Sequence, residues 1–493
     1  MKKILLQLQT LSIKCAVFGV AQMLAMLIVL LALLQTVSNS RAAQSAWVHF
    51  DNAHMLVYSN DVSGNKVMDF SSAGYMGGGV AIPNVVTVQT LNPSGGDDTA
   101  AMQGAINYVG GLAADTNGIR GALQLGTGAF LVSGQINITA SGVVVRGSGS
   151  GAGGTIIKVT ASSPITLFNI VGSGSPSTSG KVSITNSYVP SGAMMFGVSN
   201  ASGFAVGDTV IIGRTVTTNW IHYLGMDALV HNGATQTWIS AGTVITTDRT
   251  IKQISGNQIT LDAPLTDSFD TSYLGIPAGT MSKYSWTGRI SQVGLENFFI
   301  QEPAVTTTYA SVYMGSLIDS WVRDVVIQDG ARCFKTDSST KRITVDGVII
   351  QHTVATNAAA PAADFDCYGT QLFFNNCKAF GTTGNRMWPF LTQATSTGPI
   401  VLLNFYTTEI LGITPHQRWT TGVLADNCSL PNTTDGEDRF LGEQGINYCN
   451  RGTAGTGQGW ATGWSVAWNV ISPYFLVSAA TRHEKPVHRR HWD

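Results

Sequence analysis

The sequence predicts an all-β protein built as a parallel β-helix, and three observations support this fold class. Short apolar alternations cut by Gly or Ser begin near residue 120, with no segment long enough for the crossover helices of a doubly wound sheet. From residue 290, segments of the form apolar-x-apolar-x-Asn/Asp recur about every 25 residues, a period typical of solenoids. Gly supplies 55 of the 493 residues and charged residues only 12%, which suits a chain with many tight turns.

The repeated Asn or Asp should mark one bend of each coil. The eight positions are Asn297, Asp324, Asp346, Asn376, Asn404, Asn427, Asn450 and Asn469. Asn and Asp tolerate the left-handed conformation of a tight bend, and their side chains can satisfy backbone groups there. We therefore expect Asn376, Asn404 and Asn427 to stack in neighbouring coils. A leucine-rich repeat and a propeller would each need a different consensus, and neither is present.

The first 42 residues are predicted to be a signal peptide or a membrane anchor. Basic residues precede an uncharged run from Cys15 to Leu34, and a small-x-small sequence follows at Ser40–Ala42. The run is longer than a usual signal core and could also span a bilayer. Both interpretations place the remainder outside the cytoplasm, secreted, periplasmic or at the cell surface. A membrane partner is expected only if this segment is retained.

Four further parts follow. Residues 43–91 are expected to form an irregular entry segment, and residues 92–477 the β-helix domain. The domain should open with a capping helix at 97–110, because a solenoid end exposes apolar side chains and unpaired strand edges. A β-rich insertion is expected at about 204–285. The basic tail at 478–493 breaks off the apolar pattern, and we interpret it as an out-of-frame read, with a disordered basic tail as the alternative.

Four stretches of the sequence resemble a known superfamily. The runs GGDDTAAMQGAIN (95–107) and GALQLGTGAFLVSGQINITASGVVVRGSG (121–149) are similar to the opening of the pectate-lyase-like superfamily, in the group with a rhamnogalacturonase/epimerase-like N-terminal region. DFSSAGYMGGG and PHQRWTTG resemble a pectate-lyase-like subgroup. The resemblance covers roughly residues 69–477 and implies a right-handed parallel β-helix (the pectin lyase fold), export, and polysaccharide as the usual ligand. The superfamily includes lyases, hydrolases, epimerases and tailspikes, so it does not decide the reaction.

Candidate site residues come from the spacing of the repeat. Loop residues at similar offsets from the turn Asn or Asp should stack on one face, about 4.8 Å apart. The residues placed there are Arg332, Arg386, Trp388, His416, Arg418, Trp419 and Arg439. Equal offsets thus predict one ligand-facing surface, in a chain that is otherwise poor in basic residues.

These residue types suit β-elimination of a uronic-acid-containing polysaccharide. His416 can transfer a proton near neutral pH, and Arg386 or Arg418 can clamp a carboxylate with two hydrogen bonds. The predicted catalytic residues are therefore His416, Arg418 and Arg386. Trp388, Trp419, Arg332 and Arg439 are predicted to bind substrate.

A metal is not required by the sequence. Calcium could neutralise the carboxylate instead, with Asp435, Glu437 and Asp438 as weak candidate ligands in one loop. The cysteines outside the first segment are odd in number and lack metal-site spacing, so we expect them to be buried small hydrophobes, with one disulfide as the alternative.

Two other functions stay open. A glycoside hydrolase of the rhamnogalacturonase/polygalacturonase type would need two carboxylates about 5–9.5 Å apart, and the motifs NTD and GHG of polygalacturonases are absent. A non-catalytic glycan-binding surface β-helix is the second alternative. A nucleic-acid partner is excluded, because the net charge of −1 offers no basic footprint.

Overall fold

The computed structural model describes residues 45–303, 308–355, 363–385, 387–432 and 445–477. The predicted signal segment and the basic tail therefore lie outside the described residues. Within the described part of the chain, no helix is both long and apolar enough to cross a bilayer. The chain divides into two compact units, residues 1–59 and residues 60–493. In the first, strands β1 (Val48–Phe50) and β2 (Leu56–Tyr58) form an antiparallel pair, and Asp51 accepts hydrogen bonds from two backbone amides of the connecting turn.

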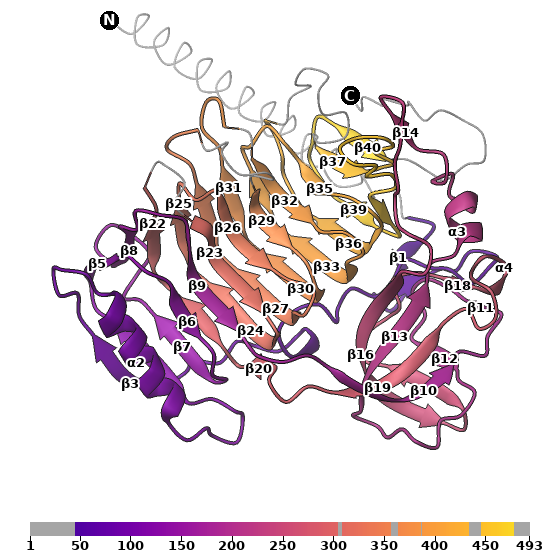
Figure 1. Ribbon diagram of the computed structural model, residues 1–493, viewed down its shortest axis with the longest axis horizontal. Helices are drawn as coiled ribbons and strands as arrows, with labels where there is room; N and C mark the ends of the chain where they lie inside the picture. The colour runs from indigo at the N-terminus through magenta and orange to yellow at the C-terminus, as the bar shows by residue number, and fades with distance from the viewer. Residues whose placement is uncertain (1–44, 304–307, 356–362, 386, 433–444, 478–493) are drawn as a thin grey trace, which may run out of the picture. The chain divides into compact units, whose positions relative to one another are not determined.

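The second unit contains three stacked parallel sheets, which confirms the predicted β-helix (Figure 1). Sheet 1 consists of β3 (Thr87–Leu91), β4 (Gly121–Leu125), β7 (Val143–Arg146), β20 (Ile290–Ser291), β21 (Gly294–Glu296), β24 (Leu317–Arg323), β27 (Lys341–Asp346), β30 (Thr370–Asn375), β33 (Thr397–Leu403), β36 (Thr420–Asp426), β38 (Thr462–Gly463) and β39 (Val466–Trp468). Sheet 2 consists of β5 (Gly128–Val132), β8 (Thr155–Val159), β22 (Phe299–Gln301), β25 (Val326–Gln328), β28 (Ile349–Gln351), β31 (Lys378–Phe380) and β34 (Tyr406–Thr407). Sheet 3 consists of β6 (Ile136–Ile138), β9 (Ile165–Val171), β23 (Thr308–Gly315), β26 (Arg332–Thr336), β29 (Ala363–Cys367), β32 (Trp388–Thr392), β35 (Ile413–Pro415), β37 (Ile446–Tyr448) and β40 (Phe475–Val477).

The predicted turn residues form a ladder between sheet 1 and sheet 2. Asn404 Nδ2 donates to Asn376 Oδ1 at 3.2 Å, and Asn427 Nδ2 donates to Asn404 Oδ1 at 2.6 Å. Asn469 continues the ladder, donating to Asn427 Oδ1 at 3.0 Å. Each of these residues has a positive φ between 49° and 55°, so the side chains stack while the backbone turns sharply. The expected stacking of Asn376, Asn404 and Asn427 is confirmed.

Two positions of the predicted repeat were wrong. In the third coil the left-handed residue is Gly347 (φ 62°) and not Asp346, which ends strand β27. A side chain would fit poorly at Gly347, because a Cβ there would lie 2.8 Å from Asp324 Oδ1. Asn450 follows strand β37 of sheet 3 and makes an antiparallel bridge to Trp460, so it belongs to another bend.

Helix α2 (Thr99–Gly111) covers the first coils, as the capping prediction required (Figure 1). Its residues Met102, Ala105, Ile106 and Val109 are buried in the interior cluster of the β-helix. The side chain of Asp97 accepts hydrogen bonds from the Thr99 backbone N–H and hydroxyl, at the start of the helix. The helix therefore covers the apolar end of the solenoid.

The insertion is antiparallel and begins earlier than about residue 204. Its strands are β10 (Ser177–Ser183), β11 (Tyr188–Val189), β12 (Met195–Gly197), β13 (Thr209–Thr215), β14 (Val230–His231), β15 (Ala234–Thr235), β16 (Val244–Ser255), β17 (Gln258–Leu261), β18 (Phe269–Asp270) and β19 (Thr280–Ser285). The helical segments α3 (Thr218–Tyr223) and α4 (Thr271–Leu274) lie in it, and the 3-10 segment η1 (Tyr75–Gly77) precedes the β-helix. The polar strand Ser177–Ser183 carries no apolar alternation, which is why the sequence did not place the boundary there.

A buried arginine holds the insertion against the coils. Arg249 is fully buried and donates to Pro264 O, to Gly398 O and to Thr370 Oγ1. Because a buried guanidinium is costly unless its N–H groups are satisfied, these bonds fix the insertion against sheet 1.

The five cysteines in the described residues are all buried and reduced, as expected from their spacing. They are Cys333, Cys367, Cys377, Cys428 and Cys449.

Candidate functional site

The outer face of sheet 3 carries acidic and polar side chains. In β29 (sequence ADFDC), Phe365 packs inside the helix against Phe334 and Phe374. Successive strand residues point to opposite faces, so Asp364 and Asp366 both point outward. Burial raises the pKa of Asp366, whose Oδ1 accepts a 2.6 Å hydrogen bond from Gln393.

The residue that directly follows each sheet 3 strand forms a second column. The strand-end pairs Cys367↔Thr392 and Thr392↔Pro415 are in register, so Tyr368, Gln393 and His416 succeed one another in neighbouring coils. Coils are spaced about 4.8 Å apart, which puts Tyr368 and His416 roughly 10 Å from each other.

His416 lies in a half-buried position beside Trp388. Their ring centroids are 6.4 Å apart. Burial, with the positive charges of Arg451 and Arg418, lowers the pKa of His416 to about 4, so its imidazole is neutral at pH 7. Nε2 contacts the Gln458 amide nitrogen at 3.3 Å, whereas Nδ1 is buried and has no hydrogen-bond partner within the described residues.

Trp388 and Arg332 stand at the opposite ends of the sheet 3 strands from His416. Both are the first residue of a strand, and the pairs Arg332↔Ala363 and Ala363↔Trp388 place them in one column, two coils apart. Trp388 Nε1 is buried without a partner among the residues the structure describes. By strand alternation Arg332 and Trp388 share the parity of the inward-facing Phe334 and Phe390, and the single ligand-facing surface stays a prediction.

Arg418 and Trp419 make structural contacts with the insertion. Arg418 Nε donates to Trp238 O at 2.7 Å, and its Nη2 donates to Thr456 Oγ1 at 2.8 Å. Trp419 is buried among Trp220 and Trp238, and its Nε1 donates to Asp267 Oδ2 at 2.7 Å. Both residues therefore hold the insertion, a use that sequence spacing alone could not reveal.

Several predicted residues lie outside the described parts of the chain. These are Arg386, Arg439, Asp435, Glu437 and Asp438, and their roles stay predictions.

A buried ladder of titratable residues lies at the bend between sheet 2 and sheet 3. Glu302, Asp329, His352 and Gly381 directly follow consecutive sheet 2 strands, and the register of β31 with β34 adds Glu409. Gly381 leaves room for its neighbour, because a Cβ there would lie 2.6 Å from Glu409 Oε2. The four ionisable side chains are all nearly inaccessible to solvent.

Charge interactions in this ladder shift two pKa values upward. Burial and the nearby Asp364 raise the pKa of Glu409 to about 8. Burial alone would lower the pKa of His352, but the Asp364 carboxylate, 2.8 Å from Nε2, outweighs it and raises the pKa.

One group in the described residues has the spacing of metal ligands. Cys333, His352 and Asp364 offer atoms within 4.8 Å of one another, a donor set that suits zinc better than calcium. However, His352 and Asp364 are already joined by a direct hydrogen bond, and burial raises the pKa of Cys333 well above its usual value. The residues therefore form a closed hydrogen-bonded cluster, and no metal role is assigned to them.

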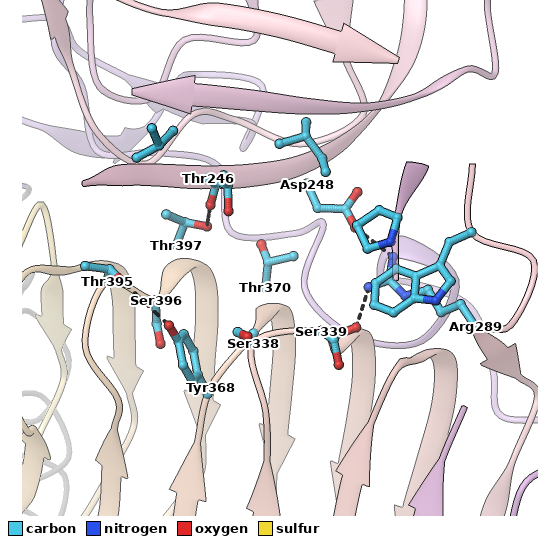
Figure 2. Close-up of a pocket in the computed structure, with 15 residues that line it drawn as sticks. Thr246, Asp248, Arg289, Ser338, Ser339, Tyr368, Thr370, Thr395, Ser396 and Thr397 are labelled. Atoms are coloured by element: carbon cyan, nitrogen blue, oxygen red, sulfur yellow. Dashed lines mark hydrogen bonds and ion pairs between the residues drawn. The ribbon is translucent and has the colours of Figure 1, made fainter. Parts of the chain in front are cut away.

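A polar cavity of about 350 Å³ lies between the insertion and the turns that lead from sheet 3 to sheet 1 (Figure 2). It includes Tyr368, from the same column as His416. The cavity therefore adjoins the outer surface of sheet 3.

Sequence reasoning missed Asp364 and Asp366. The signal was present in ADFDC, where acidic residues alternate with an apolar one in a strand of the repeat. They went unnoticed because the offsets were counted from the turn residues, and a loop of variable length separates those residues from sheet 3.

No known protein family and no curated protein matches the sequence. Solved structures with a similar fold include the tailspike protein gp49 of Pseudomonas phage LKA1, at 15% identity and a TM-score of 0.40, over 68% of this chain and 49% of that one. Others are the polygalacturonase of Erwinia carotovora (10% identity, TM-score 0.30, 80% and 94% covered) and the endo-xylogalacturonan hydrolase of Aspergillus tubingensis (12%, 0.30, 78% and 93%). The chain aligns with about half of the tailspike's length.

Proposed function

We propose that the protein is an exported, carbohydrate-active enzyme that cleaves an acidic polysaccharide by β-elimination on the outer surface of sheet 3. One observation carries this proposal: the neutral imidazole of His416 has a buried Nδ1 with no partner among the described residues, beside the ring of Trp388. A buried polar atom without a partner is costly, which favours a site completed by a ligand.

The reaction assigns a role to each group near His416. The base removes the C5 proton of a uronate, the electron pair of that bond forms the C4=C5 double bond, and the C4–O bond breaks. The leaving oxygen then takes a proton from solvent water. In this proposal His416 Nδ1 accepts the C5 proton, and a sugar ring stacks on Trp388.

Positive charge beside His416 would stabilise the uronate carboxylate and the developing negative charge. Arg451 Nη1 donates to His416 O at 2.6 Å, and its charge helps to lower the histidine pKa. Three coils away, Arg332 and Lys335 are half-buried cations in strand β26 of sheet 3, and Lys335 Nζ lies 3.9 Å from Asp366 Oδ2. These groups favour an acidic chain, and Arg332 keeps its proposed substrate role.

The tautomer of His416 depends on Gln458. If the Gln458 amide donates to Nε2, the proton sits on Nδ1 and that atom is a donor. If the amide is turned, its oxygen accepts Nε2–H and Nδ1 is the free base. Gln458 Oε1 has no partner in the described residues as oriented, so turning the amide gives that oxygen a donor and frees the base. We therefore assign the turned arrangement to the active enzyme.

Hydrolysis is the second candidate, and the Asp364/Asp366 pair favours it. The two residues are separated by one position in a strand, so their Cα atoms lie about 6.6 Å apart. That spacing is within the range of carboxylate pairs in glycosidases. The raised pKa of Asp366 suits a general acid. Asp364 Oδ1 is already hydrogen-bonded to His352 Nε2 at 2.8 Å, which is why this reaction ranks second.

A panel of pectate, alginate, glucuronan and glycosaminoglycans, incubated with the purified protein, tests the proposal. The ultraviolet absorbance of an unsaturated uronate product is expected, and it should vanish in His416→Ala but persist in Asp366→Asn. New reducing ends without that absorbance would overturn β-elimination in favour of hydrolysis. Binding without cleavage would identify a glycan-binding protein. Repeating the assay with a chelator tests the calcium alternative.

A further inference from the structure

The cavity between the insertion and the β-helix has the composition of a sugar-binding pocket (Figure 2). Its volume is about 350 Å³, and two aromatic rings and several hydroxyl groups line it. Its lining includes Thr246, Asp248, Trp286, Arg289, Ser338 and Tyr368. Thr246 and Asp248 belong to strand β16 of the insertion, whereas Ser338 and Tyr368 belong to successive turns of the β-helix.

The charged groups of the cavity are paired with one another. Arg289 Nη1 donates to Asp248 Oδ2 at 2.7 Å, and Lys341 Nζ lies 2.9 Å from Asp248 Oδ1. Burial alone would raise the pKa of Asp248, but Lys341 and Arg289 outweigh it and lower the pKa to about 2. Arg289 Nη2 also donates to Ser339 O at 2.7 Å. The cations therefore serve Asp248 and the backbone, and the cavity is not arranged to hold a carboxylate.

Three hydroxyl groups in the cavity remain available to a ligand. The only contact of the Tyr368 hydroxyl in the described residues is a long one, 3.5 Å to Thr395 Oγ1. The hydroxyls of Thr246 and Ser338 are on exposed residues and make no hydrogen bond within the described ranges. Hydroxyl groups both donate and accept, which matches the hydroxyls of a sugar.

An aromatic face completes the pocket. Trp286 is half-buried and held by a 2.8 Å hydrogen bond from its Nε1 to Ser173 O. The guanidinium of Arg289 lies 5.1 Å from its ring centroid. A fixed ring with hydroxyls around it resembles the arrangement of ligand sites in general, where a few polar groups orient a ligand against apolar surface.

We propose that this cavity binds an uncharged sugar unit of the same polysaccharide whose uronate reacts at His416. Tyr368 belongs to the column that ends at His416, two coils or roughly 10 Å away. A chain lying along sheet 3 therefore reaches both places. The substrate is then a heteropolysaccharide, or carries neutral branches, and is not a pure polyuronate. That the bound sugar belongs to the reacting polysaccharide rests on the proposed function, whereas binding of a neutral sugar in the cavity does not.

The test measures binding separately from cleavage. Methyl glycosides of glucose, galactose, rhamnose and xylose, with methyl galacturonate salt as the charged counterpart, are titrated into the full chain while saturation-transfer NMR is recorded. At least one neutral glycoside is expected to bind, more tightly than the charged one. Tyr368→Phe and Thr246→Val each remove one hydroxyl with little change of shape, and each should weaken binding about threefold to tenfold.

The controls separate the two hypotheses. Tyr108→Phe changes an exposed tyrosine on helix α2 and should leave binding unchanged. If His416→Ala loses no activity but neutral sugars bind and respond to Tyr368→Phe, the cavity inference holds and the proposed reaction fails. If no neutral glycoside binds, or if the binding affinity is unchanged in both cavity variants, the inference is overturned regardless of the catalytic activity.

Discussion

The rings of Trp388 and His416 lie with their centroids 6.4 Å apart, although 27 residues separate them in the chain. The register of β32 with β35 produces this proximity, since it sets the two segments in neighbouring coils. Each ring has a buried nitrogen without a partner in the described residues. The pair therefore offers a stacking surface next to a neutral proton acceptor.

Replacing His416 by Ala should abolish turnover and leave the melting temperature nearly unchanged. Because burial and Arg451 lower the pKa to about 4, the imidazole is neutral above that pH. Turnover should accordingly stay level from about pH 5 to 8 with respect to this group, and fall as the pH drops through 4. A pH profile of kcat checks this. His222→Ala is the matched control, because His222 is exposed on helix α3 and pairs only with Asp227 in the described residues. An inflection near pH 6.5 would contradict the assignment.

Replacing Arg418 by Ala should destabilise the fold instead of merely stopping turnover. The sequence predicts a carboxylate clamp, with lost activity at an unchanged melting temperature. The guanidinium instead holds Trp238 O and Thr456, so its loss should cost roughly 2–3 kcal/mol. Chemical denaturation with fluorescence detection measures it. Arg418→Lys keeps the charge but not the planar fork, and should recover only part of the stability. An Arg418→Ala variant with native stability and no turnover would instead support the predicted role as a carboxylate clamp.

The Asn ladder can be separated into backbone and side-chain contributions. Asn404 has φ 55° and bonds to Asn376 and Asn427. Asn404→Ala should cost about 2–4 kcal/mol, since it loses two hydrogen bonds and strains the left-handed backbone. Asn404→Gly keeps that conformation free of strain and should cost clearly less. Equal losses in urea denaturation would show that the conformation contributes nothing.

Stability should fall as the pH rises above about 5, owing to the buried ladder. Glu409 has a folded pKa of about 8 against the usual 4.5, so the folded state holds its proton more tightly. That stabilisation is full below pH 4.5 and is lost as the pH passes 8, and His352, whose pKa is also raised, acts in the same sense. Asp364, Asp329 and Glu302 are the other charged groups facing this pair.

Glu409→Gln imitates the protonated acid and keeps an oxygen for Asn385 Nδ2, which bonds Glu409 Oε1 at 2.6 Å. Its melting temperature should match that of the wild type at pH 5 and exceed it at pH 9. The corresponding gain in the free energy of unfolding at pH 9 should be on the order of a few kcal/mol. Melting curves across this range measure the difference. A constant offset at all pH values would show that the residue does not titrate in this window.

The repeat in the sequence was enough to predict the solenoid, because Asn376, Asn404 and Asn427 mark the same bend by local conformation. The site could not be located from those positions alone. The loops between sheet 2 and sheet 3 differ in length, so equal counts from the bend reach different columns. Arg418 illustrates a second limit: its partner Trp238 lies 180 residues earlier in the chain, in the insertion. Contacts at that separation leave no local pattern in a single sequence.

The insertion leaves and re-enters the β-helix at one place. Ser173 N donates to Gly288 O at 2.8 Å and Trp286 Nε1 donates to Ser173 O at 2.8 Å, so the two ends of the excursion lie side by side. The coil on either side is therefore almost continuous without the segment between them. Evolution, or an engineer, could exchange that segment for another while the coils keep their register, and each replacement would bring a new wall to the cavity beside Tyr368. The β-helix would then stay constant, and exchange of the insertion would change which ligand the cavity prefers.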